Sequence, residues 1–262
     1  RMENLKKIKL IPLIAAFLSV MTVNSYAATV TSGFFGIDDY PPAGKSDDDR
    51  AGYSYVRNLN GELNALLNPS HTYTNTFMYK DSQEKRLPFI SKANGDPCTL
   101  FGFSGHGYPG KGIGGGPLLY DGKANKTSLK FKHRYVVMYS CNWLWNGGSK
   151  DELRGTYRTF NGTRLQMGFG TQMWLDAREG IAYGQRLMRE TVGSAFVNAA
   201  RIFQPQNDKD VVVKVVGYTG ARMDYITNSY PAAPVYNGRN DGQFKEHFNC
   251  KIKGTGKKIT WP

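Results

Sequence analysis

The chain of 262 residues contains little cysteine, and its basic residues outnumber its acidic ones. Three cysteines are an odd number, so at least one stays unpaired unless it pairs between molecules. The 21 Asp and Glu stand against 34 Lys and Arg, which gives a net charge of +13. Hydrophobic residues make up 40% of the chain and aromatic residues 13%, so a sizeable core is available and global disorder is excluded.

No apolar run reaches the ~20 residues that span a bilayer. The longest run, residues 10–20, follows three lysines within residues 6–9, and Ser25-Tyr26-Ala27 then supplies the small residues that a signal peptidase reads. This pattern predicts an export signal over residues 1–27, with cleavage after Ala27. We therefore expect a periplasmic or secreted protein without a membrane anchor.

The remaining residues, 28–262, contain neither a low-complexity linker nor an internal repeat, which favours a single domain. Without the leader, 30 basic and 20 acidic residues leave a net charge of +10. The charges are scattered, and no arginine-rich helix or known reader motif is present, so a solvated surface is favoured over nucleic-acid binding. Polyanions of the cell envelope remain candidate partners, and the sequence does not indicate an oligomeric state.

Short apolar runs alternate with segments of helical periodicity. The sequence predicts strands over residues 33–37, 73–79, 99–103, 135–139, 165–170 and 211–216, the last of them closing the sheet, and helices over residues 51–67 and 192–203. Continuous apolar runs are typical of strands buried on both faces of a parallel sheet. We therefore expect an α/β fold with a mostly parallel central sheet and helices on both faces, and a ligand site at the carboxyl ends of the strands.

Two of these strand ends carry residues suited to nucleophilic chemistry. Ser104-Gly105-His106-Gly107 follows the run at 99–103, and Ser140-Cys141 follows the run at 135–139. Adjacent parallel strands would place both segments at one edge of the sheet. An imidazole within reach of a thiol can take its proton or stabilise the thiolate, which is the reactive form.

These two segments resemble the signature segments of the caspase, legumain and gingipain superfamily of cysteine peptidases, and the overall pattern is most similar to a bacterial secreted branch of it. The resemblance implies a caspase-like three-layer sandwich and an exported cysteine endopeptidase that acts on a protein or peptide substrate without a cofactor. By position, His106 is then the base and Cys141 the nucleophile, and the N–H groups of Gly107 and Cys141 form the oxyanion hole. The alternative is a catalytically inactive binding or interaction module on the same scaffold.

The neighbours of this pair are candidates to line a substrate cleft: Ser104, Ser140, Asn142 and Trp143. Trp143 also fits packing in the core. Asn142-Trp143 replaces the basic residue and glycine that follow the nucleophile in caspases, so the caspase preference for Asp does not carry over. If Cys141 must stay reduced, Cys98 and Cys250 are the pair available for a disulfide.

No metal site is expected. His71, His133 and His247 share no metal-ligand spacing with one another or with a cysteine. The acidic residues at 38–39 and 47–49 lack the alternating ligands of a calcium loop, which favours a solvated acidic turn.

Overall fold

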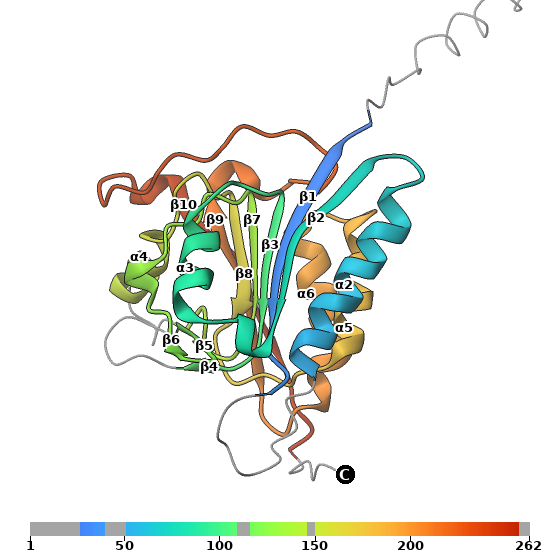
Figure 1. Ribbon diagram of the computed structural model, residues 1–262. Helices are drawn as coiled ribbons and strands as arrows, with labels where there is room; N and C mark the ends of the chain where they lie inside the picture. The colour runs from blue at the N-terminus through green and yellow to red at the C-terminus, as the bar shows by residue number, and fades with distance from the viewer. Residues whose placement is uncertain (1–26, 40–50, 109–115, 146–149, 257–262) are drawn as a thin grey trace, which may run out of the picture.

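The structure is a computed structural model that describes residues 27–39, 51–108, 116–145 and 150–256 (Figure 1). The expected export signal, apart from Ala27, lies outside the described residues. Within the described ranges, no helix has both the length and the apolar character that a membrane crossing requires.

A seven-stranded sheet in the order β10-β9-β8-β7-β3-β1-β2 forms the centre of the molecule. Five neighbouring strands, from β2 to β8, run parallel, whereas β9 is antiparallel to both β8 and β10. The strands are β1 (Thr29–Gly36), β2 (Thr72–Lys80), β3 (Leu100–Ser104), β7 (Tyr135–Tyr139), β8 (Leu165–Phe169), β9 (Val211–Tyr218) and β10 (Phe244–Ile252). The prediction of an α/β fold with a mostly parallel sheet is confirmed.

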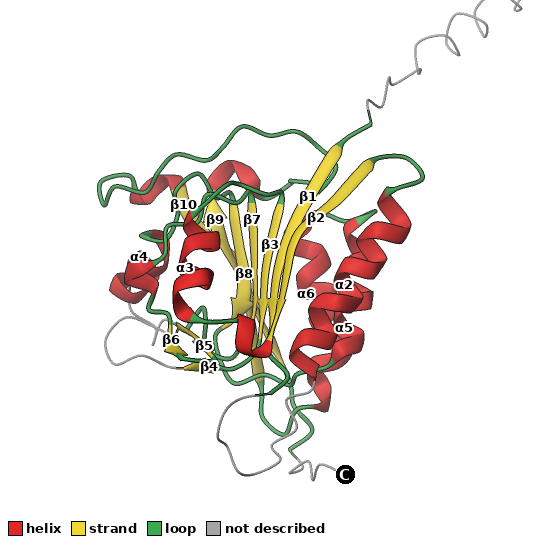
Figure 2. Cartoon of the chain, in the orientation of Figure 1, coloured by secondary structure: helices red, strands yellow, loops and turns green. Residues whose placement is uncertain are grey.

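Helices cover both faces of this sheet (Figure 2). One face carries α2 (Ala51–Leu67), α5 (Ala177–Leu187) and α6 (Val192–Phe203), and the other carries α3 (Arg86–Asn94) and α4 (Lys150–Tyr157). The helix expected over residues 51–67 is confirmed at both ends. Three short strands, β4 (Gly107–Tyr108), β5 (Gly116–Leu119) and β6 (Gly122–Lys123), form a separate small sheet.

The central strands have apolar side chains on both faces because both faces are buried. All five residues of β7 are buried, and they alternate between the two core clusters. Tyr135, Val137 and Tyr139 pack on the side of α2, α5 and α6, while Val136 and Met138 pack on the other side. Successive side chains of a strand point to opposite faces, so one continuous apolar run contributes to the core on both sides of the sheet.

The α-helices between strands account for the direction of several strands. A single α-helix returns the chain to the end of the sheet where the previous strand began, and β1 to β2, β2 to β3 and β7 to β8 each have one α-helix among the described residues between them. Strands β3 and β7 also run parallel, with the three short strands of the small sheet between them. Between β8 and β9 lie two helices, α5 and α6, which bring the chain back to the carboxyl edge of β8. Strand β9 therefore runs antiparallel.

The expectation that the strand at 211–216 closes the sheet was wrong. This segment is β9, and β10 pairs with it as a further, outer strand. The β10 sequence mixes charged and apolar residues because an edge strand has one partner strand and is partly exposed, so it lacks the apolar run that marks an interior strand.

Candidate active site

His106 and Cys141 lie at the same edge of the sheet on neighbouring strands. Strands β3 and β7 pair in parallel, and Ser104 lies opposite Tyr139. The backbone N–H of Gly105 extends this pairing by donating to the carbonyl oxygen of Tyr139 at 3.2 Å. His106 and Cys141 each follow two residues after the last paired position, so the predicted placement at the carboxyl ends of adjacent parallel strands is confirmed.

The backbone after His106 packs directly against Cys141. A Cβ atom built on Gly107 would lie 1.8 Å from the carbonyl oxygen of Cys141 and 2.3 Å from Oγ of Ser140. Real Cβ atoms do not approach other atoms this closely, so only glycine fits at position 107. This contact joins the two segments that carry the candidate base and the candidate nucleophile.

Cys141 is half-buried, and its thiol contacts the segment that follows a third strand, β8. The backbone N–H of Met173 donates to Sγ at 3.4 Å, and Sγ lies 3.7 Å from the carbonyl oxygen of the same residue. Met173 belongs to the irregular segment 170–176 between β8 and α5. The sequence does not indicate this residue, because a contact made by the backbone has no side-chain signature.

The turn after Cys141 contains a strained residue. Asn142 has φ +56°, in the left-handed region, where asparagine is tolerated better than most residues other than glycine. Its N–H donates to the carbonyl oxygen of Thr171 at 2.9 Å, and its carbonyl oxygen accepts from the N–H of Trp145 at 3.1 Å. Strained positions of this kind concentrate at functional sites because surrounding contacts must hold them.

Three of the residues expected to line a cleft are instead buried. Ser104, Ser140 and Trp143 have no exposed surface, whereas Asn142 is partly exposed. Trp143 packs edge-on against Phe131 in the cluster beneath α3 and α4. The two serines and Trp143 therefore belong to the packed interior below the strand ends, and the cleft interpretation of these three is corrected.

The expected disulfide between Cys98 and Cys250 does not form. All three cysteines lie in the described part of the chain, and none takes part in a disulfide. Cys98 precedes β3, whereas Cys250 lies in β10, and three strands separate them. Four interstrand spacings amount to roughly 19 Å, well beyond the ~7 Å between Cα atoms that a disulfide can bridge.

Cys98 instead pairs with a histidine, at the amino-terminal end of β3. Its Sγ lies 3.1 Å from Nδ1 of His133, which also accepts the N–H of Cys98. Burial raises the pKa of Cys98 to about 12 and lowers the pKa of His133 to about 4. Both groups are therefore neutral near pH 7, and this buried pair is unsuited to nucleophilic catalysis.

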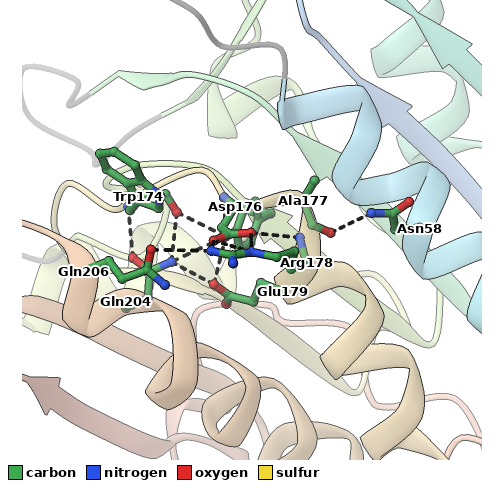
Figure 3. Close-up of polar contacts among 9 residues, drawn as sticks. Asn58, Trp174, Asp176, Ala177, Arg178, Glu179, Gln204 and Gln206 are labelled. Carbon is green, nitrogen blue, oxygen red and sulfur yellow. Dashed lines mark hydrogen bonds and ion pairs between the residues drawn. The ribbon is translucent and has the colours of Figure 1, made fainter. Parts of the chain in front are cut away.

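A buried polar network contacts the main chain of Trp174, the residue after Met173 (Figure 3). The carboxyl group of Glu179, fully buried at the start of α5, accepts from the hydroxyl of Tyr139 and from Nε2 of Gln204, each at 2.8 Å. Burial raises the pKa of Glu179 to about 8, against the opposing effect of these hydrogen bonds. The sequence does not indicate that these residues meet, because they lie far apart along the chain and match no motif.

Among the described residues, no group of three or more His, Cys, Asp or Glu side chains is arranged to hold a metal ion. The acidic residues at 47–49 lie outside the described ranges. Asp38, near the end of β1, instead accepts the N–H of Tyr53 at 2.6 Å, at the start of α2.

Comparison with known proteins identifies one family. The profile of a domain of unknown function, DUF6345, matches residues 56–243. This range includes both candidate catalytic residues and the network around Glu179, and it leaves out β1 and β10. No curated protein matches the sequence significantly. Because the match covers well over half of the sequence, the chain belongs to the DUF6345 family.

Proposed function

We propose that this protein is a cysteine endopeptidase in which Cys141 is the nucleophile and His106 the base. The observation that carries the proposal is the meeting of the two residues' segments at one sheet edge, where Gly107 packs against the carbonyl oxygen of Cys141. Glycine at this contact allows an approach that any other residue would prevent. The left-handed Asn142 directly after the cysteine gives further support.

We also propose that the fold is a caspase-like sandwich. Five parallel strands with helices on both faces are compatible with this architecture. In addition, the candidate base ends one strand and the candidate nucleophile ends its neighbour, as in the superfamily that the two segments resemble.

The chemistry follows from these two side chains. His106 takes the thiol proton of Cys141 as sulfur attacks the peptide carbonyl carbon, and the resulting oxyanion accepts hydrogen bonds from the N–H groups of Gly107 and Cys141. The C–N bond then breaks, and His106 returns the proton to the leaving amine. In the second half, His106 deprotonates a water that attacks the thioester, and the proton returns to sulfur as the C–S bond breaks.

The proposal includes export, supported by the lysine-rich and apolar pattern before Ala27. Substrates would then be proteins or peptides outside the inner membrane. Fractionation of cells that produce the chain with a C-terminal tag tests this part. We expect a shortened form that begins at Ala28 outside the cytoplasm, and an unprocessed chain retained in the cytoplasm would contradict export.

Peptide-library profiling of the purified protein tests the activity. We expect Cys141→Ala to abolish cleavage and His106→Ala to lower its rate on the order of 10²- to 10⁴-fold. Cys250→Ala is the matched control, because Cys250 is a partly buried cysteine on the outer strand β10, and this variant should cleave like the wild type. Cleavage by Cys141→Ala would contradict the assignment of the nucleophile. A folded wild-type protein that cleaves no peptide would favour the inactive binding module.

A further inference from the structure

The side-chain amide of Gln204 holds the main chain of Trp174 at both polar groups (Figure 3). The N–H of Trp174 donates to Oε1 of Gln204, and Nε2 of Gln204 donates to the carbonyl oxygen of Trp174, both at 2.9 Å. Gln204 is fully buried at the end of α6. The Gln204 amide thus bonds both the N–H and the carbonyl oxygen of Trp174, as the backbone of a neighbouring strand would.

Glu179 and Tyr139 determine how this amide is oriented. The second N–H of Gln204 Nε2 donates to Oε2 of Glu179 at 2.8 Å, and the hydroxyl of Tyr139 lies 2.8 Å from the same oxygen. Both hydrogens of the amide nitrogen therefore have acceptors, and a flipped amide would place its oxygen against two acceptors. The Gln204 side chain has one favourable orientation here.

The held segment is the one that contacts the thiol. Residues 172–176 form no regular secondary structure, so no strand ladder fixes their position. Within this segment the N–H of Met173 donates to Sγ of Cys141, and the next residue, Trp174, is held by Gln204. The position of the Met173 N–H relative to sulfur thus depends on the contacts that the Gln204 amide makes one residue further on.

We propose that Gln204, oriented by Glu179, is a positioning residue that aligns the Met173 N–H with the thiol of Cys141. A hydrogen bond to sulfur favours the thiolate, and the N–H nitrogen lies closer to sulfur than the Met173 carbonyl oxygen does, 3.4 Å against 3.7 Å. The catalytic consequence rests on the proposed peptidase function. The effect on the thiol itself does not require that function.

The test is the pH dependence of iodoacetamide alkylation at Cys141, followed by mass spectrometry of the peptide that contains it. In Gln204→Leu, which removes the amide at similar volume, we expect the midpoint of alkylation to rise by about one pH unit, a tenfold loss of thiolate at a given pH. Gln166→Leu is the matched control. Gln166 is equally buried in β8, but its Nε2 bonds Thr159, so its removal should leave the midpoint unchanged. Equal shifts in both variants, or no shift in Gln204→Leu, would overturn the proposal.

A second pair of variants keeps the test decisive if Gln204→Leu does not fold. Glu179→Leu removes the acceptor that orients Gln204 and should raise the midpoint in the same direction. Glu179→Gln keeps an acceptor for Gln204 and should restore the wild-type midpoint. A wild-type midpoint in Glu179→Leu, or an equal rise in Glu179→Gln, would count against the proposed role.

The peptidase assay separates this proposal from the proposed function. If the wild type cleaves peptides, Gln204→Leu should lower kcat more than it raises KM, because the substrate-binding groups remain. If the wild type cleaves nothing, the alkylation midpoints still decide whether Gln204 positions the thiol.

Discussion

At the scale of single residues, Gly107 carries the closest contact of the candidate site. Its Cα lies so near the carbonyl oxygen of Cys141 that a methyl group has no space, and the atom in the way belongs to the backbone. Side chains can rotate away from an added methyl group, whereas a backbone carbonyl at a strand end can yield only if the strands separate. A side chain larger than hydrogen at position 107 would therefore change how the ends of β3 and β7 are placed relative to each other.

We expect Gly107→Ala to lower the free energy of unfolding by at least about 2 kcal/mol, because the added methyl forces backbone movement. Gly61→Ala is the matched control, since a Cβ at this exposed position in α2 meets nothing within 4 Å. That variant should be stabilised by about 0.5–1 kcal/mol through the higher helix propensity of alanine. Urea denaturation of both variants measures the difference, and a Gly107→Ala protein as stable as the wild type would show that the two strand ends are not in contact.

Glu179 should make stability depend on pH. Burial raises its pKa from 4.5 to about 8, so between these values the folded protein holds a proton that the unfolded chain releases. The free energy of unfolding therefore falls as pH rises through this window. His133, whose pKa is lowered from 6.5 to about 4, gives the opposite slope between pH 4 and pH 6.5. The Glu179 effect is best isolated above pH 6.5.

Between pH 6.5 and pH 8 we expect the wild type to lose roughly 2 kcal/mol more stability than Glu179→Gln. Other groups that face Glu179, namely Asp176, Tyr55 and Tyr139, are present in both proteins and cancel in the comparison. Chemical denaturation at the two pH values measures both slopes. Parallel slopes would mean that Glu179 is ionised in the folded protein.

At the scale of secondary-structure elements, the start of α5 determines where the Met173 segment ends. Asp176 is its N-cap residue, and its side chain accepts the N–H of Arg178 at 2.9 Å. Asp176 also contributes its own N–H to the hydroxyl of Tyr139 at 3.2 Å. The helix cap and the buried network therefore meet at one residue (Figure 3).

We expect Asp176→Ala to lower the free energy of unfolding by about 1 kcal/mol through loss of the cap. Asp176→Asn should cost much less, because asparagine caps helices well and the ion pair with Arg178 involves a largely exposed guanidinium. Denaturation midpoints of the two variants give the answer. Equal losses would indicate that the charge of Asp176, and not its capping oxygen, provides the stability.

Prediction from sequence was most accurate for elements with a continuous or one-sided apolar pattern. The strands β3 and β7 and the helix α2 have continuous or one-sided apolar patterns because their neighbours cover them. Strand β7 and helix α2 have the expected bounds, and β3 is shifted by one residue from the expected range. Strand β10 mixes charged and apolar residues without regular alternation at the edge of the sheet, so its sequence resembles that of a loop. The antiparallel direction of β9 was not predicted either, because a valine-rich run has the same apolar pattern in both directions.

At the scale of the whole molecule, the sheet separates the cysteines into different environments. Cys98 is buried at the amino-terminal end of β3, and the half-buried Cys141 follows the carboxyl end of β7. Cys250 lies on the outer strand β10. The number of cysteines and the expected oxidising compartment favour a pair between Cys98 and Cys250 but contain no information about distance. The three intervening strands exclude that pair.

We expect protein purified without reductant to show three reactive thiols toward Ellman's reagent after denaturation, and its melting temperature to be unchanged by added reductant. In the folded protein Cys98 should react slowest, because it is buried and its pKa is raised to about 12. Protein reduced beforehand serves as the control. Fewer than three thiols, or a linked pair of peptides after non-reducing digestion, would contradict the arrangement of strands.

The sequence alone determined the fold class and the two strand ends at which chemistry is proposed, because apolar runs followed by His106-Gly107 and Cys141 are local features. Tertiary structure decided which backbone group contacts the thiol and which side chains hold the segment that contains it. Met173, Glu179 and Gln204 come from segments up to 63 positions beyond Cys141, and they meet because two helices fold back onto one face of the sheet. Their contacts depend on packing and strand order, and the spacing of residues along a chain does not encode either directly.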